Sequence, residues 1–303
     1  MESLLSRDVH EAKVRTTPAK YRFLFIQPFQ LPNDSQFADK YHSAVLSKEQ
    51  RLRMDYLPIR PLLADVEWDF HGGPIAPYGD WAVETREEFA QVAAARLPIV
   101  RDACASGKYN AIVLLGGGEP GFLESREIAR GYGIAVSSCA FSQMHFAAML
   151  GHKFSVIDFT ETHNMYYYDL VVRHRFDERC ASIRNINYYH ARPGLTVEST
   201  IADERERALR GERSEAVERA VREAEAAIEE DGAEVITFGC SDAFWLQPFL
   251  KKRLHDLGWE VPVLEGYSCA IALAKVLVDL RMDASGLTFP SDHPRRWRRK
   301  KTF

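Results

Sequence analysis

The sequence has no apolar run long enough to cross a membrane. Its apolar stretches, such as Ala111–Leu115 and Val235–Phe238, are far shorter than the ~20 residues that a spanning helix needs. The amino terminus, MESLLSRDVHEAKVRTTPAK, has acidic residues where a secretory signal has a basic start followed by an apolar stretch. We therefore expect no membrane partner and no secretion.

Cysteine is scarce and irregularly spaced. The five cysteines are odd in number and contain no CxxC pair, so they form neither a disulfide framework nor a metal-binding motif. They are Cys104, Cys139, Cys180, Cys240 and Cys269. The ten histidines contain no HExxH or comparable ligand spacing. We expect reduced thiols in a cytoplasmic protein and no metal.

The sequence also has little excess charge. A formal net charge of −4 gives no overall reason to expect a nucleic acid partner. With 46% hydrophobic and 27% charged residues the composition is that of a globular protein, and 303 residues suffice for two domains with their own cores. The basic run Pro294–Lys301 is a local exception, which we interpret as a solvated tail. Removal of residues 292–303 should therefore leave the fold intact.

Predicted strands alternate with predicted helices, which indicates parallel sheets. In the first half, apolar runs and helical spacing predict strands Tyr21–Gln27, Ala111–Leu115 and Ile134–Ser137 and helices Glu84–Ala105 and Glu124–Tyr132. Pro98 should bend the first of these helices or split it. In the second half, the same signals predict strands Phe154–Asp158, Arg179–Ile186, Val235–Phe238 and Val261–Leu264 and helices His145–Leu150, Tyr166–Phe176, Ser214–Glu230, Phe244–Leu257 and Ser268–Leu280.

Two segments repeat one arrangement. AIVLLGGGEPGFLESREIA and EVITFGCSDAFWLQPFLKKRL are each a buried strand, a glycine-containing turn and a helix. This duplication predicts an α/β fold of two similar lobes, each a parallel sheet flanked by helices. Ligands of such sheets bind outside the carboxyl ends of the strands, so we expect the active site in the cleft between the lobes.

The expected boundaries follow from this repeat. A flexible segment covers residues 1–20, the first lobe covers 21–138 together with 266–283, the second lobe covers 139–265, and a basic tail covers 284–303. The turns that contain Gly116 and Cys240 should then face each other.

Cys240 lies in the turn Gly239–Asp242, between a predicted strand and a predicted helix. A thiol at a helix N-terminus faces free backbone N–H groups, which stabilise the thiolate and lower its pKa. Such a thiolate can remove a proton from carbon or attack an electrophile. A small buried residue that merely fills the turn is an equally good interpretation, since free cysteine is commonly buried.

The turn Gly116–Gly121 formally matches the dinucleotide fingerprint GxGxxG. No ribose-binding acid follows about 20 residues later, where the chain reads Ala135–Ser138, so we expect no nucleotide cofactor. Gly116, Gly117 and Gly118 have two remaining interpretations. They let helix and strand approach closely, or their backbone N–H groups form a pocket for a carboxylate or an imide oxygen.

Four segments in order carry a family resemblance over roughly Tyr21 to Leu280. They are YNAIVLLGGGEPGFLESREIA at 109–129, QMHFAAMLGHKFSV at 143–156, the turn with Cys240, and VPVLEGYSCAIALAKVL at 261–277. The chain resembles hydantoin and allantoin racemases of the aspartate/glutamate/hydantoin racemase superfamily. This resemblance places Cys240 on the second catalytic cysteine of the family. It also implies that Gln27, Gly116, Gly117, Gly118, Ser138, Ser241 and Asp242 bind the substrate.

One departure affects the expected mechanism. The first catalytic cysteine of the family falls on Gly116, which has no side chain to move a proton. The arylmalonate decarboxylase branch of the superfamily has the same single-cysteine pattern. A rearranged two-base scheme would instead use Cys139 or Glu119 as the second acid or base.

The resemblance implies a cofactor-independent enzyme in which cysteine moves a proton at a carbon next to a carbonyl. We expect a racemase or isomerase of a hydantoin-, ureide- or amino-acid-like substrate. A single-cysteine decarboxylase of a malonate-type acid remains open, as does a binding protein that has lost catalysis. The expected partner is a small carboxylate or a cyclic amide, and we expect a homo-oligomer.

Overall fold

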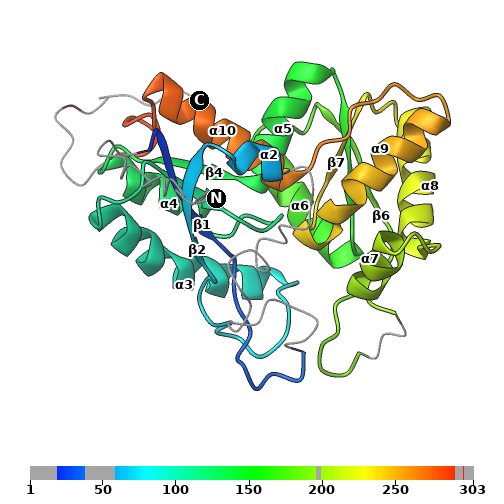
Figure 1. The fold of residues 1–303 in the computed structure, drawn as a ribbon, viewed down its shortest axis with the longest axis horizontal. Helices are drawn as coiled ribbons and strands as arrows, with labels where there is room; N and C mark the ends of the chain where they lie inside the picture. The colour runs from blue at the N-terminus through cyan, green and yellow to red at the C-terminus, as the bar shows by residue number, and fades with distance from the viewer. Residues whose placement is uncertain (1–18, 38–58, 196–198, 291–295, 297–303) are drawn as a thin grey trace, which may run out of the picture.

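The computed structural model describes residues 19–37, 59–195, 199–290 and 296, which contain two parallel sheets flanked by helices (Figure 1). One sheet has four strands in the order β2-β1-β3-β4, and the other has three in the order β6-β5-β7. All pairings within them are parallel. The predicted α/β fold with two parallel sheets is confirmed.

The four-stranded sheet is built mainly from the first half of the chain. Its strands and the helices between them are β1 (Tyr21–Ile26), α2 (Arg60–Leu63), β2 (Val66–His71), α3 (Arg86–Ala105), β3 (Ala111–Leu114), α4 (Phe122–Arg130) and β4 (Ala135–Ser138). Every residue of β3 and β4 is buried, as expected for strands covered on both faces.

The three-stranded sheet is built from the second half. Its strands and helices are α5 (Cys139–Leu150), β5 (Phe154–Asp158), α6 (Glu161–Arg173), β6 (Cys180–Asn185), α7 (Ile201–Leu209), α8 (Glu215–Glu229), β7 (Val235–Phe238), the 3-10 helix η2 (Ser241–Leu246) and α9 (Gln247–Asp256). The central strand β5 is buried along its whole length, and α8 buries the apolar face that the sequence predicted.

The last helix, α10 (Gly266–Leu280), follows the three-stranded half but packs against β3, β4 and α5 (Figure 1). Tyr21 at the start of β1 donates a hydrogen bond to Asp279 of α10 at 2.9 Å. The chain therefore returns to its first sheet at its end. The expected lobe boundaries at 138/139 and 265/266 remain predictions.

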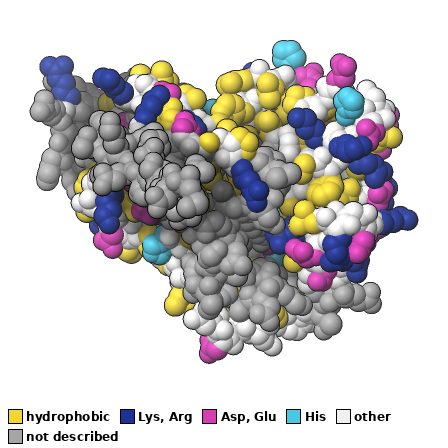
Figure 2. Space-filling view, in the orientation of Figure 1, with side chains coloured by type: hydrophobic (Ala, Val, Ile, Leu, Met, Phe, Trp, Pro, Cys, Tyr) yellow, Lys and Arg dark blue, Asp and Glu magenta, His cyan; other side chains and the backbone are white. Residues whose placement is uncertain are grey.

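Figure 2 shows acidic and basic side chains interspersed over the described surface of α7, α8 and α9, whereas hydrophobic side chains gather near α5 and α10. Exposed apolar residues of these two helices include Met149, Leu150, Val276 and Leu280. They are a candidate contact for the homo-oligomer, which stays a prediction. Within the described ranges, no helix is long and apolar enough to cross a membrane.

Three local predictions need correction. Helix α3 is continuous through Pro98 and is not split there. Pro98 has no N–H to donate to the carbonyl of Ala94. Both residues lie on the exposed face of the helix, where water can bond to that carbonyl. The residues after Cys240 form η2 before α9 begins, not one helix from Phe244. Val261–Leu264 makes only an isolated bridge between Val263 and Ile236, since Pro262 has no N–H to donate.

The sequence did not predict β2, α2 or α7. Strand β2 reads VEWDFH, with charged residues between partly buried aromatic ones, because it is an edge strand with one exposed face. The expectations for residues 1–18, and those for residues 291–295 and 297–303 of the tail, fall outside the described residues.

Candidate active site

A pocket lies outside the carboxyl ends of β1, β3 and β7, as expected for parallel sheets. It encloses about 490 Å³, a volume that includes space open to solvent at its mouth. Residues from both halves of the chain line it, namely Gln27, Pro28, Phe29, Ala82, Val83, Phe89, Gly116, Gly117, Gly118, Pro120, His163, His190, Cys240, Ser241 and Asp242. The two duplicated turns thus face one pocket.

The two turns touch directly because both contain glycine. A Cβ atom on Gly117 would lie 1.7 Å from the carbonyl oxygen of Gly239, and one on Gly239 would lie 2.3 Å from Cγ of Asp158. No side chain fits in either place. Glycine at 117 therefore lets the two turns approach each other, and glycine at 239 leaves room for the carboxyl group of Asp158.

The end of β7, which leads into the Cys240 turn, is held from both sides. Gln143 of α5 donates from its side-chain amide to the carbonyl of Phe238, and its amide oxygen accepts from the Phe238 N–H, both at 3.0 Å. Asp158, at the end of β5, accepts a hydrogen bond from the Cys240 N–H at 3.0 Å. These bonds fix the backbone that carries the thiol.

Cys240 lies beside His163 and His190, and both rings interact with its thiol. The thiol is buried, which alone would disfavour the thiolate. The charge of His163 and the hydrogen bonds from the two histidines nevertheless hold the pKa of Cys240 below its usual value. The cause is this pair of imidazoles, not the start of an α-helix, because the thiol precedes a short 3-10 helix.

His163 is the ring whose charge favours the anionic form of the Cys240 thiol. Burial disfavours its charged form, but the neighbouring Cys240 and Asp158 raise its pKa to about 9. Its Nδ1 lies 3.7 Å from Oδ1 of Asp158. The arrangement is a buried thiol–imidazole pair backed by a carboxyl group, in which a protonated imidazole favours the anionic form of the sulfur.

His190 lies beside the thiol and contacts two further carboxyl groups, those of Asp242 and Glu84. Its Nε2 lies 3.0 Å from Oδ2 of Asp242, and its Nδ1 lies 3.3 Å from Oε1 of Glu84. Arg192 donates to the other oxygen of Glu84 at 2.8 Å. Although burial favours the neutral acid, His190 and Arg192 lower the pKa of Glu84 to about 2. Glu84 is therefore an anion that orients the His190 ring.

The opposite wall presents backbone, not ionisable side chains. Gly116, Gly117 and Gly118 have no side chains, so their lining atoms are main-chain atoms. The buried guanidinium of Arg96 in α3 supports this wall by donating to the carbonyls of Ile26, Leu115 and Pro120 at 2.5 to 3.0 Å.

The structure brings together most of the residues that the sequence singled out. Those that line the pocket are Gln27, Gly116, Gly117, Gly118, Cys240, Ser241 and Asp242. Three other candidates, Glu119, Ser138 and Cys139, do not line it. Sequence reasoning missed His163 and His190, and nothing in their local sequence distinguishes them from other histidines.

The three outlying candidates have interior partners. Glu119 accepts hydrogen bonds from Ser138 and His174 and from the Phe141 N–H at 2.9 Å, so its carboxylate is occupied between β4, α5 and α6. The Cys139 thiol is fully buried and points to the Leu114 carbonyl at 3.7 Å. Burial raises its pKa well above the usual range. Neither is placed to act as a second acid or base.

Comparisons with known proteins agree with this architecture. The protein-family model described as Asp/Glu/Hydantoin racemase matches residues 76–274. A hydantoin racemase of Pseudomonas sp. (strain NS671) is 27% identical over 178 residues, which cover 59% of this chain and 62% of that relative. The chain thus spans less than two thirds of the length of that relative.

Solved structures share the fold over more of the chain. Allantoin racemase from Pseudomonas fluorescens aligns with a TM-score of 0.64 and 23% identity, covering 91% of this chain and 98% of that one. A double mutant of arylmalonate decarboxylase in a liganded form aligns with a TM-score of 0.53 and 14% identity, covering 86% and 93%. Since the family model spans well over half of the sequence, this chain belongs to the Asp/Glu/Hydantoin racemase family.

Proposed function

We propose that this chain is a carbon-acid enzyme of the racemase or isomerase type, in which the Cys240 thiolate moves a proton at a carbon next to a carbonyl. The observation that carries this proposal is the buried pair of Cys240 and His163 at the pocket wall. A thiolate kept anionic by an adjacent imidazolium is a base at neutral pH and becomes an acid after it has taken the proton. No metal or nucleotide is needed for such a step.

The glycine wall supplies the complementary function. Removing a proton next to a carbonyl places negative charge on the carbonyl oxygen, and fixed backbone N–H donors stabilise such an oxyanion. Main-chain atoms of Gly116–Gly118 line the pocket opposite the thiol, with no side chain in the way. Gln27 lines the same region and offers a further amide group.

The polar groups and the size of the pocket suit a small carboxylate or a cyclic amide. Relatives named hydantoin racemase and allantoin racemase favour a hydantoin- or ureide-like substrate. The apolar lining from Phe29, Val83 and Phe89 would accept a hydrocarbon substituent next to the reacting carbon.

A second candidate, decarboxylation of a malonate-type acid, is favoured by one observation. All ionisable residues that line the described pocket, His163, His190, Cys240 and Asp242, come from the second half of the chain. Racemisation is simplest with proton carriers on both faces of the carbon. Loss of carbon dioxide followed by protonation needs a carrier on one face only.

Proton NMR in deuterium oxide tests both candidates with hydantoins, allantoin, amino acids, maleate and substituted malonates. Exchange of the hydrogen at the reacting carbon, with change of configuration, supports the racemase. Release of carbon dioxide with one deuterium added to one face supports the decarboxylase. Binding of these compounds without exchange or decarboxylation would contradict both and indicate a binding protein.

A further inference from the structure

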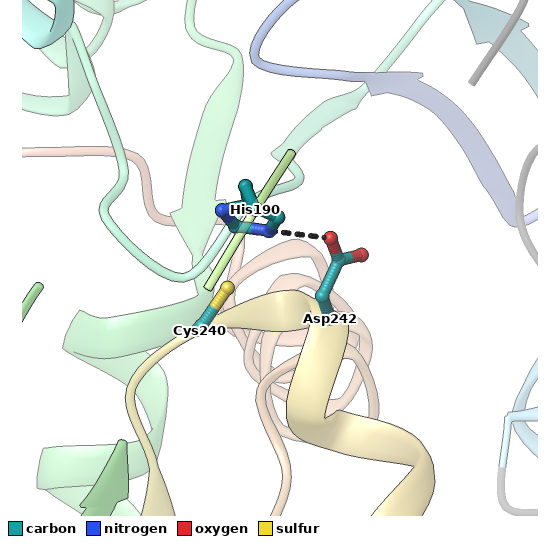
Figure 3. A group of neighbouring side chains, drawn as sticks. All are labelled: His190, Cys240 and Asp242. Atoms are coloured by element: carbon teal, nitrogen blue, oxygen red, sulfur yellow. Dashed lines mark hydrogen bonds and ion pairs between the residues drawn. The ribbon is translucent and has the colours of Figure 1, made fainter. Parts of the chain in front are cut away.

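Three side chains at the thiol wall carry donor atoms that Zn²⁺ prefers. His190, Cys240 and Asp242 converge on one point of the pocket (Figure 3), and their ligand atoms lie within 4.8 Å of one another. We propose that these three residues bind Zn²⁺, and that bound Zn²⁺ reversibly inhibits the enzyme by occupying the Cys240 sulfur.

The donor geometry is close to that of a zinc site. Zinc bonds of about 2.3 Å to sulfur and about 2.0–2.2 Å to nitrogen and oxygen place tetrahedral ligand atoms roughly 3.3–3.7 Å apart. Nε2 of His190 and Oδ2 of Asp242 are already 3.0 Å apart. Small side-chain rotations would therefore open the space for the ion. A thiolate and an imidazole favour Zn²⁺ over Mg²⁺ or Ca²⁺, which prefer oxygen ligands.

The group that orients the histidine is also present. A histidine that ligates zinc through one nitrogen commonly donates its other N–H to a carboxylate. Here Nδ1 of His190 lies 3.3 Å from Glu84, and Arg192 holds that carboxylate in place. This contact lies on the side of the ring away from Asp242, so it fixes which nitrogen faces the proposed ion.

The site has three protein ligands and opens to the pocket. His190 and Cys240 are buried and Asp242 is partly buried, and all three line the cavity. The fourth position would face the space where substrate binds. A sulfur bonded to zinc cannot carry a proton, and this inhibitory consequence rests on the proposed function, whereas binding itself does not.

The ligands were not visible as a sequence motif, because they come from the loop after β6 and from η2. The expectation that activity requires no metal stays a prediction, and it is compatible with a metal that inhibits. Zinc would be a ligand of the resting enzyme, removed by a chelator.

The test uses the full-length chain after treatment with a chelator. Zn²⁺ is titrated by calorimetry, and Co²⁺ by its absorption, which reports a thiolate ligand and tetrahedral geometry. We expect one ion per chain, with affinity reduced at least ~100-fold in His190→Ala and Asp242→Asn and about 10–100-fold in Glu84→Gln. Cys139→Ser, which removes a buried thiol outside the pocket, should bind as the wild type does.

Three outcomes would overturn the proposal: no one-to-one binding, binding that is unchanged in both ligand variants, or a cobalt spectrum without a thiolate ligand. Isotope exchange measured in parallel separates the two proposals. If the substrate exchanges its hydrogen in the presence of chelator but the chain does not bind Zn²⁺, this inference alone is overturned. If the chain binds Zn²⁺ but no substrate exchanges its hydrogen, the zinc site is supported and the proposed function is contradicted. Exchange that rises with Zn²⁺ overturns the inhibitory role.

Discussion

The two walls of the pocket are built from similar sequence segments but present different chemical groups. Each begins as a buried strand followed by a glycine-containing turn, β3 with Gly116–Gly118 and β7 with Gly239 and Cys240. The first wall offers main-chain atoms, held by Arg96. The second holds a thiol between two histidines. The first wall thus offers main-chain atoms, while the second offers the ionisable side chains that we propose exchange protons.

The largest expected effect comes from removing the thiol of the second wall. Cys240→Ser replaces an ionised sulfur by a hydroxyl that is far harder to ionise, so turnover and isotope exchange should fall by about 10²–10⁴ with binding largely retained. Cys139→Ser is the matched control, because that thiol is buried away from the pocket, and it should stay near wild type. An active Cys240→Ser together with an inactive Cys139→Ser would show that the wrong thiol was chosen.

The next prediction tests the contact between the walls. In Gly117→Ala, a Cβ at 1.7 Å from the Gly239 oxygen forces the turns apart, and unfolding in urea should show a loss of about 1–3 kcal/mol. Activity should fall with it. Gly131→Ala is the control, since Gly131 has helical φ and ψ and only an ordinary contact at 3.6 Å. Equal stability of the two variants would mean that the walls do not touch.

A third prediction concerns the imidazolium of the second wall. The thiolate–imidazolium pair exists between the lowered pKa of Cys240 and the pKa of His163, about 9, so activity should decline as pH rises through about 9. In His163→Asn, burial of the thiol is no longer opposed by this charge, and the acid limb should move to higher pH. Each pH unit of that shift reduces the fraction of Cys240 that is thiolate at lower pH by roughly tenfold. An unchanged pH profile would show that His163 does not affect the ionisation of the Cys240 thiol.

The last prediction concerns the pH dependence of stability, at the carboxyl group that contacts His190 on the side away from Asp242. The pKa of Glu84 is lowered to about 2 in the folded chain from about 4.5 when unfolded. Its stabilising contribution is therefore present above pH 4.5 and is lost as pH falls through 2. Glu84→Gln should lower the free energy of unfolding by about 1–3 kcal/mol at pH 7 and by less below pH 4. The exposed Glu87→Gln, in the first turn of the helix α3 that begins two residues after Glu84, should show no such difference.

The sequence by itself determined the family, the parallel α/β architecture and the side of the sheets on which the pocket lies. Short apolar runs such as those of β3 and β7 are typical of strands buried on both faces of a parallel sheet. The glycine turns that follow these two strands present backbone atoms in place of side chains. This local reasoning pointed to Gly116–Gly118 and Cys240, and the family resemblance added Gln27, Ser241 and Asp242, all of which line the pocket.

Only the tertiary structure decided which ionisable groups surround the thiol. Cys139 follows a strand as Cys240 does, but the first turn of α10 covers Cys139. A Cβ atom on Gly266 of that turn would lie 2.6 Å from the Cβ atom of Cys139. His163 and His190 reach Cys240 because the sheet order β6-β5-β7 puts the first turn of α6, which follows β5, and the loop after β6 beside the end of β7. Strand order depends on long-range packing, which no spacing within a segment records.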